Sequence, residues 1–200
     1  MMTTAPAPEV LLDHRGNPRA TIEMGLSYEQ ARLGSAFHEA GHAVVAMAYG
    51  VHVVSSEVIA WLPEPGRYAV TGYTAYEFRP SMPWQFAAQC AAGTLAEVQY
   101  LMVHGLWTPD RAVSCAAVHD REQAIDLLAE NGFRLDRDRV PAGGKSWGQV
   151  RGMARRRVGL LWREIRTVAH AMNENTKLTG EQIAAMTGLA NAPMQVGGAA

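Results

Sequence analysis

The sequence predicts an α+β fold that is mainly helical and carries one small β-sheet. Three observations predict it. Long apolar stretches with helical spacing make up most of the chain, whereas strand-forming composition is confined to residues 51–74. Length is the second observation, since 200 residues suit one globular domain with a sizeable core. Composition is the third, because 48% hydrophobic and 18% charged residues exclude a disordered chain.

The N-terminal quarter predicts a flexible lead followed by a helix. Residues 1–26 are rich in Pro, Gly and Thr, so we expect them to be flexible. A helix is expected over about 28–49, because its second half is almost entirely apolar and Gly50 is a residue type that commonly ends a helix. We expect the globular domain to span residues 27–190.

A small sheet is expected next to this helix. β-branched and aromatic residues favour strands. A Pro- and Gly-containing turn at 63–66 separates the expected partners, which are strands at 51–54, 57–61 and 68–74.

The C-terminal part predicts a helical bundle. Thr179 and Gln182 have the spacing of a capping box, which indicates a last short helix. A Gly-rich loop is expected at 131–146 and a disordered tail at 191–200. The other expected helices are 83–104, a helix that carries Asp120 and runs to Glu130, and 147–173.

The helix expected over residues 28–49 contains the motif HExxH, as HEAGH at positions 38–42. Residues four apart lie on one helical face, so His38 and His42 can bind one ion. Glu39 is then placed to act as general base on a water activated by the metal, as in zincin-like peptidases. The alternative is an amphipathic helix with these side chains in water.

The surroundings favour the metal site. Nearly all residues from 43 to 49 are apolar, so the helix is expected to be buried, and buried polar groups need partners. Zinc would provide that partner. The spacing alone leaves the third ligand open among six residues: His52, His104, His119, His170, Glu97 and Asp120.

Three blocks of sequence resemble the peptidase domain of the FtsH family, the membrane-bound AAA+ zinc proteases. They are FHEAGHAVV at 37–45, AGTLAE at 92–97 and HDREQA at 119–124, similar to the family's HEAGHA helix, AGRxAE helix and NDxxxAT segment. Gly72-Tyr73-Thr74 also falls where the family has a GYT strand. The resemblance covers about residues 28–189.

The resemblance implies a zinc-dependent endopeptidase with a defined site. By it, Asp120 is the third zinc ligand, and Glu97 orients a ligand from outside the coordination sphere. We expect the strand with Gly72, Tyr73 and Thr74 to bind an extended polypeptide by strand addition.

The chain departs from that family in what it lacks. No Walker A pattern occurs, so we expect no ATPase module and an ATP-independent activity on extended or unfolded polypeptides. No apolar stretch has the pattern expected of a membrane span. The first residues do not have the pattern of a secretory signal. A homo-oligomer or an ATPase acting in trans would fit the resemblance, but no residue indicates either.

Net charge bears on nucleic acid binding, and cysteine content bears on the cellular compartment. A net charge of −1 gives no general case for nucleic acid binding, so the arginines between 151 and 163 are interpreted as a solvated helix face. Two cysteines, Cys90 and Cys115, in apolar surroundings indicate reduced core residues of a cytoplasmic protein. Two other functions remain as alternatives: a zinc-binding interaction module without turnover, and a repressor-cleaving regulator that docks through the Arg-rich helix.

Overall fold

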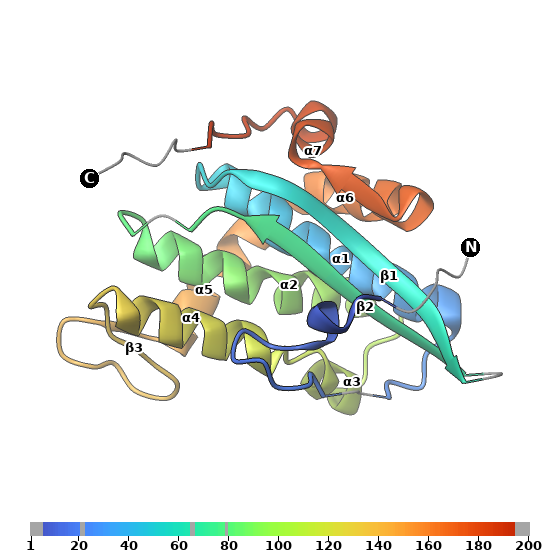
Figure 1. Ribbon diagram of the computed structural model, residues 1–200, viewed down its shortest axis with the longest axis horizontal. Helices are drawn as coiled ribbons and strands as arrows, with labels where there is room; N and C mark the ends of the chain where they lie inside the picture. Colours follow the sequence, from blue (N-terminus) through green and yellow to red (C-terminus); the bar gives the residue numbers. More distant parts are fainter. Residues whose placement is uncertain (1–5, 21–22, 65–66, 79, 195–200) are drawn as a thin grey trace.

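Two long helices, α1 (Tyr28–Ala48) and α2 (Pro83–Val103), pack against each other at the centre of the fold. The computed structural model describes residues 6–20, 23–64, 67–78 and 80–194. One side of α1 is covered by a three-stranded sheet, and further helices cover α2 (Figure 1). The prediction of a mainly helical α+β fold is confirmed.

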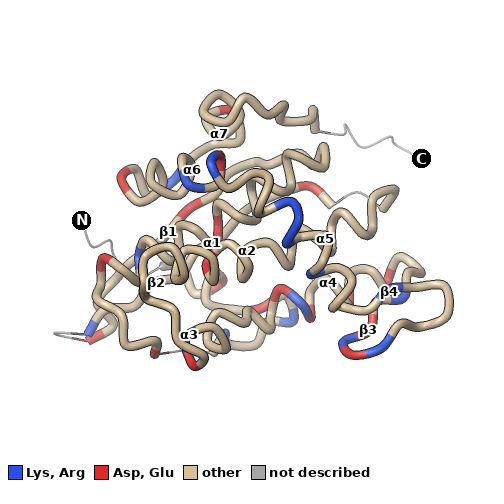
Figure 2. The backbone as a smooth tube through the Cα atoms, turned by 180° about the vertical axis from the view of Figure 1, so that it is seen from behind, with Lys and Arg blue, Asp and Glu red and all other residues tan. Residues whose placement is uncertain are grey.

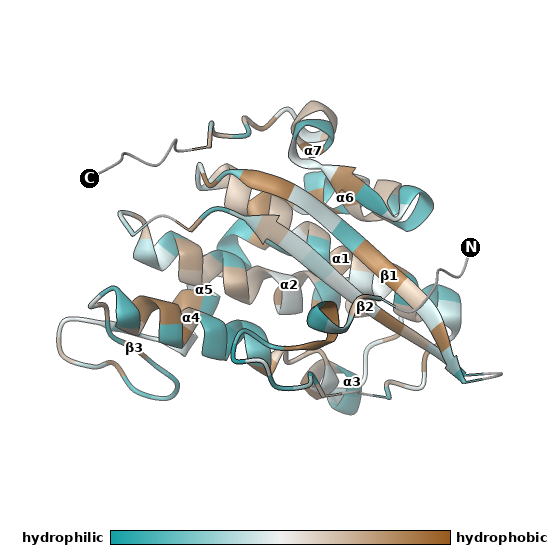
Figure 3. Cartoon of the chain, in the orientation of Figure 1, coloured by the Kyte–Doolittle hydropathy of each residue, from teal (hydrophilic) through white to brown (hydrophobic). Residues whose placement is uncertain are grey.

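The sheet is antiparallel, with the strand order β2-β1-β5. Its strands are β1 (Val53–Glu64), β2 (Arg67–Tyr76) and β5 (Lys177–Thr179). Ser56, Val58 and Ala60 are buried at alternating positions of β1, as expected for a strand with one face on a helix. Figure 3 shows more hydrophobic colour along β1, the central strand, than along β2.

The sheet differs from the prediction in two places. The strands predicted at 51–54 and 57–61 are one strand, β1, because pairing with β2 continues through the polar residues between them. The short strand β5 was not predicted, since its three residues are ordered only by pairing with β1. Residues 65 and 66 of the predicted turn lie outside the described residues.

The remaining helices are α3 (Pro109–Ser114), α4 (Val118–Glu130), α5 (Trp147–Leu160), α6 (Trp162–Asn175) and α7 (Gly180–Thr187). Of these, α4 and α5 pack on α2, α6 packs on α1, and α7 packs on α6 and α1. The loop predicted at 131–146 holds two short parallel strands, β3 (Leu135–Asp136) and β4 (Lys145–Ser146). Thr179 and Gln182 form the expected capping box of α7.

The single helix predicted at 147–173 is wrong, because the chain bends between α5 and α6. Leu161 leaves helical geometry, with φ −105° and ψ 19°. The two halves then pack on different partners, α5 on α2 and α6 on α1. Apolar periodicity continues through the bend, so the sequence alone does not reveal it.

Both ends of the chain make contacts where the sequence predicts flexibility. In the lead, residues 8–11 form a 3₁₀ helix, η1 (Pro8–Leu11), and His14 bonds to Asp126 of α4. In the predicted tail, the Asn191 side chain bonds to the backbone of Val53, and residues 195–200 lie outside the described residues.

Within the described part of the chain, no helix combines the length and the apolar character that crossing a membrane requires.

The crossing of α1 and α2 is close because small residues face each other. A Cβ atom at Gly41 would lie 2.7 Å from the Cβ of Ala96 and 2.8 Å from the carbonyl oxygen of Ala92. Neither neighbour can rotate away, since both are fixed to the α2 backbone.

Gly41→Ala is therefore expected to lower the free energy of unfolding by about 1–3 kcal/mol, because the two helices must move apart. Gly152→Ala on α5 is the matched control: nothing lies within 4 Å of its added Cβ, and we expect a gain of about 0.4–1 kcal/mol. Urea unfolding followed by circular dichroism measures both. Equal effects of the two substitutions would contradict the close crossing.

Candidate metal centre

Three side chains from two helices converge beside α2. His38 and His42 lie one turn apart on α1, and Asp120 lies in the first turn of α4. Oδ2 of Asp120 is 3.2 Å from Nε2 of each histidine, and the two Nε2 atoms are 3.0 Å apart. The three side chains are 7–13% exposed, so the cluster is largely shielded from water.

The hydrogen bonds of the imidazoles show which nitrogens carry protons. Nδ1 of His42 is 2.7 Å from the carbonyl oxygen of Gln89, and Nδ1 of His38 is 3.1 Å from Oε2 of Glu97. Both oxygens can only accept, so each Nδ1 donates and each neutral imidazole has its lone pair on Nε2. When both imidazoles are neutral, as metal binding requires, two imidazole lone pairs and a carboxylate oxygen therefore face one another.

A metal cation fits this arrangement. Three acceptors at such distances repel one another unless positive charge lies between them, and one cation can satisfy all three at once. Ligand bonds of about 2.0 Å in tetrahedral geometry place ligand atoms about 3.3 Å apart, close to the observed triangle. The Nδ1–H bonds to a carboxylate and a carbonyl are the contacts that typically orient metal-binding histidines.

The backbone of α2 approaches this cluster at a glycine. A Cβ atom at Gly93 would lie 2.3 Å from Nε2 of His42 and 2.6 Å from Nε2 of His38. Any side chain at this position would occupy the space that the two ligand atoms share. Glycine thus keeps the point of convergence open.

The electrostatics of the cluster favour positive charge. Burial alone lowers the pKa of His38, but its bonds to Asp120 and Glu97 outweigh burial and hold the pKa well above its usual value. Burial raises the pKa of Asp120, yet the nearby His42 and His38 hold it well below its usual value. Asp120 is therefore ionised, as a ligand must be.

Glu39 lies next to the cluster and faces β2. Its Oε2 accepts a hydrogen bond of 2.7 Å from the Thr74 hydroxyl. Burial raises the pKa of Glu39, and the charges of His38 and His42 and the Thr74 bond oppose this rise. A raised pKa suits a general base that works near neutral pH.

The predicted substrate strand meets Glu39 at two positions. A Cβ at Gly72 would lie 2.5 Å from Oε1 of Glu39, so only glycine lets the strand approach this closely. Thr74 is buried and orients Glu39, whereas Tyr73 is 46% exposed. Of the three predicted substrate-binding residues, Tyr73 presents its side chain to solvent and the other two support the glutamate.

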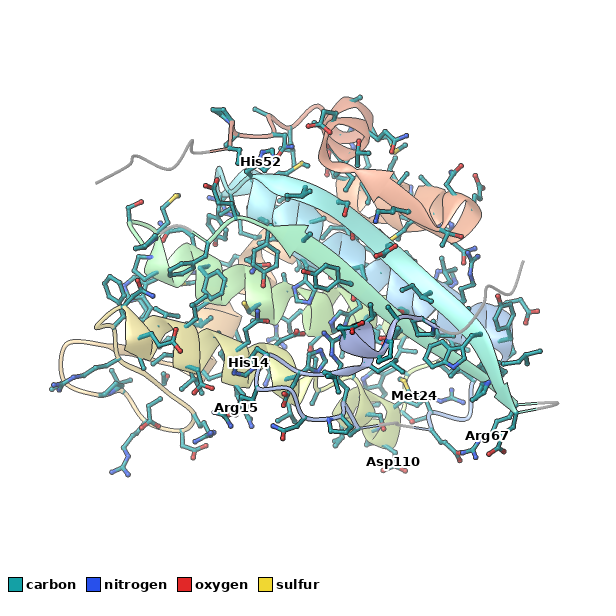
Figure 4. The ribbon with its side chains drawn as sticks, viewed as in Figure 1. His14, Arg15, Met24, His52, Arg67 and Asp110 are labelled. Carbon is teal, nitrogen blue, oxygen red and sulfur yellow. The ribbon has the colours of Figure 1, made fainter. Side chains whose placement is uncertain are left out.

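Of the other candidate ligands, three histidines lie outside the triangle, and Glu97 contacts one of its histidines. Nδ1 of His52 donates to the carbonyl oxygen of Ala192, at the end of β1 that is remote from the cluster (Figure 4). The rings of His104 and His170 pack near Phe37, at ring distances of 6.4 and 5.9 Å. Glu97 contacts His38, where the resemblance implies an orienting residue.

His119 lies beside the cluster. Its Nε2 is 3.3 Å from Oδ1 of Asp120, the carboxylate oxygen that does not face the other histidines. Burial lowers the pKa of His119 to about 4, so this imidazole is neutral at pH 7. The structure thus brings Asp120, and not His119, into the triangle with His38 and His42.

A cavity of about 120 Å³ opens onto Glu39, His42 and Asp120. One wall is β2 and another is the start of α4. The remaining lining residues are Arg19, Gly72, Tyr73, Thr74, Tyr76, His119 and Gln123. A small ligand or a short segment of extended chain can reach the cluster from this side.

The Arg-rich helix face lies away from this cavity. Figure 2 shows the basic residues gathered on α5 and around β3. Arg157 lies over the Tyr49 ring, 4.9 Å from its centre, and Arg163 pairs with Glu164 at 2.7 Å. Neither residue lines the cavity.

The sequence patterns did not predict the parts that Gly93, Arg19 and the carbonyl of Gln89 play in the site. Gly93 belongs to the block at 92–97 that resembles an FtsH-family helix, but nothing in its spacing indicates contact with both histidines. Arg19 lies in the segment that was expected to be flexible. The carbonyl of Gln89, which orients His42, carries no sequence signal at all because every residue has a carbonyl group.

No model of a known protein family matches this chain, and no curated protein matches it either.

Proposed function

We propose that the protein is a zinc-dependent endopeptidase that hydrolyses extended or unfolded polypeptides, similar to the peptidase domain of the FtsH family. One observation carries the proposal. The Nε2 atoms of two imidazoles and a carboxylate oxygen converge at 3.0–3.2 Å directly beside a buried glutamate, at the end of an open cavity. A purely structural zinc site needs no such glutamate and no access from solvent.

Each residue has a distinct role in this proposal. His38, His42 and Asp120 hold the zinc, which, when bound, polarises the scissile carbonyl and lowers the pKa of a water molecule to about 7. Glu39 accepts a proton from the attacking water and then donates it to the leaving amine. Glu97 and the Gln89 carbonyl fix the orientation of the two imidazoles.

The size of the cavity supports an extended substrate. About 120 Å³ holds a few atoms of one chain segment, so an extended chain or a flexible loop fits the cavity better than the surface of a folded domain. β2 forms one edge of the sheet, which suits pairing with an added strand. Buried free thiols at Cys90 and Cys115 support a reducing compartment such as the cytoplasm.

The test is a matched pair of substrates, one stable protein and a destabilised variant of it, incubated with zinc-loaded enzyme. We expect cleavage in proportion to the open fraction of each substrate, and none after removal of zinc with a chelator. No cleavage of an unfolded chain by the zinc-loaded protein would contradict the peptidase. Equal rates on both substrates would instead contradict the requirement for unfolding.

Thr74→Val is expected to move the acidic limb of the pH profile of kcat/KM to higher pH. The Thr74 hydroxyl donates to the ionised carboxylate of Glu39 and so lowers its pKa, and without this bond the pKa rises. Glu39 must be deprotonated to accept a proton, so activity would be lost at a higher pH as the solution is acidified.

Zinc content has to be measured at each pH, so that loss of metal is not mistaken for protonation of Glu39. Thr71→Val on the same strand is the control, because Thr71 makes no contact with Glu39 among the hydrogen bonds of the described residues. An acidic limb that stays in place in Thr74→Val would mean that this hydroxyl does not tune the base.

A further inference from the structure

The N-terminal segment, defined as residues 11–19, runs from α4 to β2 (Figure 1). At α4, Oδ2 of Asp126 accepts bonds of 2.7 Å from Nε2 of His14 and from Nε of Arg15. His14 and Arg15 are labelled beside α4 in Figure 4. The segment is closed by a bridge between Leu12 and Pro18. It is therefore attached to the helix that carries Asp120.

The other end of the segment places Arg19 in the cavity. Nε of Arg19 donates to the Leu12 carbonyl at 3.0 Å, which holds the guanidinium within its own segment. Nη1 reaches the carbonyl oxygen of Gly72 at 3.5 Å, on the strand that contacts Glu39. The side chain is partly buried and lines the cavity beside the catalytic glutamate.

Most donors of this guanidinium remain for a ligand. Arginine has five N–H groups, and the two bonds above use one on Nε and one on Nη1. Nη2 donates to none of the residues in the described ranges. A partly buried guanidinium that is held at the wall of a cavity and has donors to spare can bind a carboxylate through two parallel bonds.

The charges around the cavity also favour an anion. Arg19 is the single Lys or Arg among the described residues that line it, and Glu39 and Asp120 are its carboxylates. With zinc bound, the positive charges of the metal and Arg19 exceed those of the two carboxylates by one. This net positive charge favours a substrate that carries one negative charge.

We propose that Arg19 is a specificity residue that binds a carboxylate of the substrate close to the scissile bond. This inference rests on the proposed function and adds a substrate class, acidic peptides. The carboxylate has two sources, an Asp or Glu side chain or the C-terminus of a peptide. Arg19 binds and positions this group and takes no part in proton transfer.

The experiment uses four synthetic peptides of one sequence: Glu or Gln beside the scissile bond, each with a free or an amidated C-terminus. Wild-type protein loaded with zinc is expected to prefer a carboxylate by about 10- to 100-fold in kcat/KM, mainly through KM. Comparison of the Glu and Gln peptides detects recognition of a side-chain carboxylate. Comparison of the free and amidated peptides detects recognition of a C-terminal carboxylate. Arg19→Gln should remove the preference, mainly by raising KM for the peptides that carry the carboxylate.

Two further variants separate charge from structure. Arg19→Lys keeps the positive charge but loses the paired donors, so part of the preference should return. Arg15→Gln is the matched control, since Arg15 belongs to the same segment but does not line the cavity, and His14 still binds Asp126. This control should keep the wild-type preference.

Binding is measured as well, by fluorescence polarisation of labelled peptides on the zinc-loaded Glu39→Gln variant, with and without Arg19→Gln. Equal binding of acidic and neutral peptides, or a preference that survives Arg19→Gln, would overturn the role of Arg19. Absence of hydrolysis by the wild type would overturn the proposed function alone, because the binding comparison still decides on Arg19.

Discussion

Glu39→Gln is expected to abolish peptide hydrolysis while zinc content and stability stay close to those of the wild type. The amide has nearly the same shape as the carboxylate but cannot accept the proton from water. Loss of a general base costs about 10²–10⁴-fold in rate, so activity should fall by at least about 100-fold. The measurement is kcat/KM on an unfolded substrate, beside the zinc content of both proteins.

Two features make this substitution a clean test. Oε2 of Glu39 accepts its bond from Thr74, and an amide oxygen can accept the same bond, so the side chain should stay in place. Glu29→Gln, on the exposed first turn of the same helix, is the matched control and should leave the rate unchanged. Wild-type activity in Glu39→Gln would refute the mechanism even if zinc were bound.

Asp120→Ala is expected to weaken zinc binding by more than about 100-fold, whereas His119→Ala should weaken it much less, by about 10-fold. Asp120 contributes the third atom of the triangle with His38 and His42. His119 contacts only the outer oxygen of that carboxylate. Loss of an orienting partner outside the coordination sphere typically costs about 10–100-fold, so loss of a ligand should cost more.

Competition with a chromophoric chelator measures these affinities at fixed pH. Glu97→Gln completes the series: the amide oxygen can still accept the bond from Nδ1 of His38, so we expect a loss of about 10-fold or less. Equal losses in Asp120→Ala and His119→Ala would move the third ligand to His119. A loss confined to Glu97→Gln would move it to α2.

Local sequence patterns predicted the parts of the site that lie within one helix. His38, Glu39 and His42 share one helix, so helical periodicity is enough to place them on adjoining faces. The same holds for the capping box of α7 and for the bounds of α1 and α2, which agree with the predicted ranges to within one residue. These features depend on residues no more than a few positions apart.

Tertiary structure decided which distant residues join them. Asp120 is 82 positions from His38 in sequence, and spacing alone left five other residues as alternatives for the third ligand. The close approach of α2 at Gly93, the bend between α5 and α6 and the position of Arg19 likewise follow from packing between elements. A repeating local pattern specifies an element and its buried face, but contacts between elements depend on how all buried faces pack at once. The sequence therefore determined the helix that carries the two histidines and the base, and only folding determined what surrounds them.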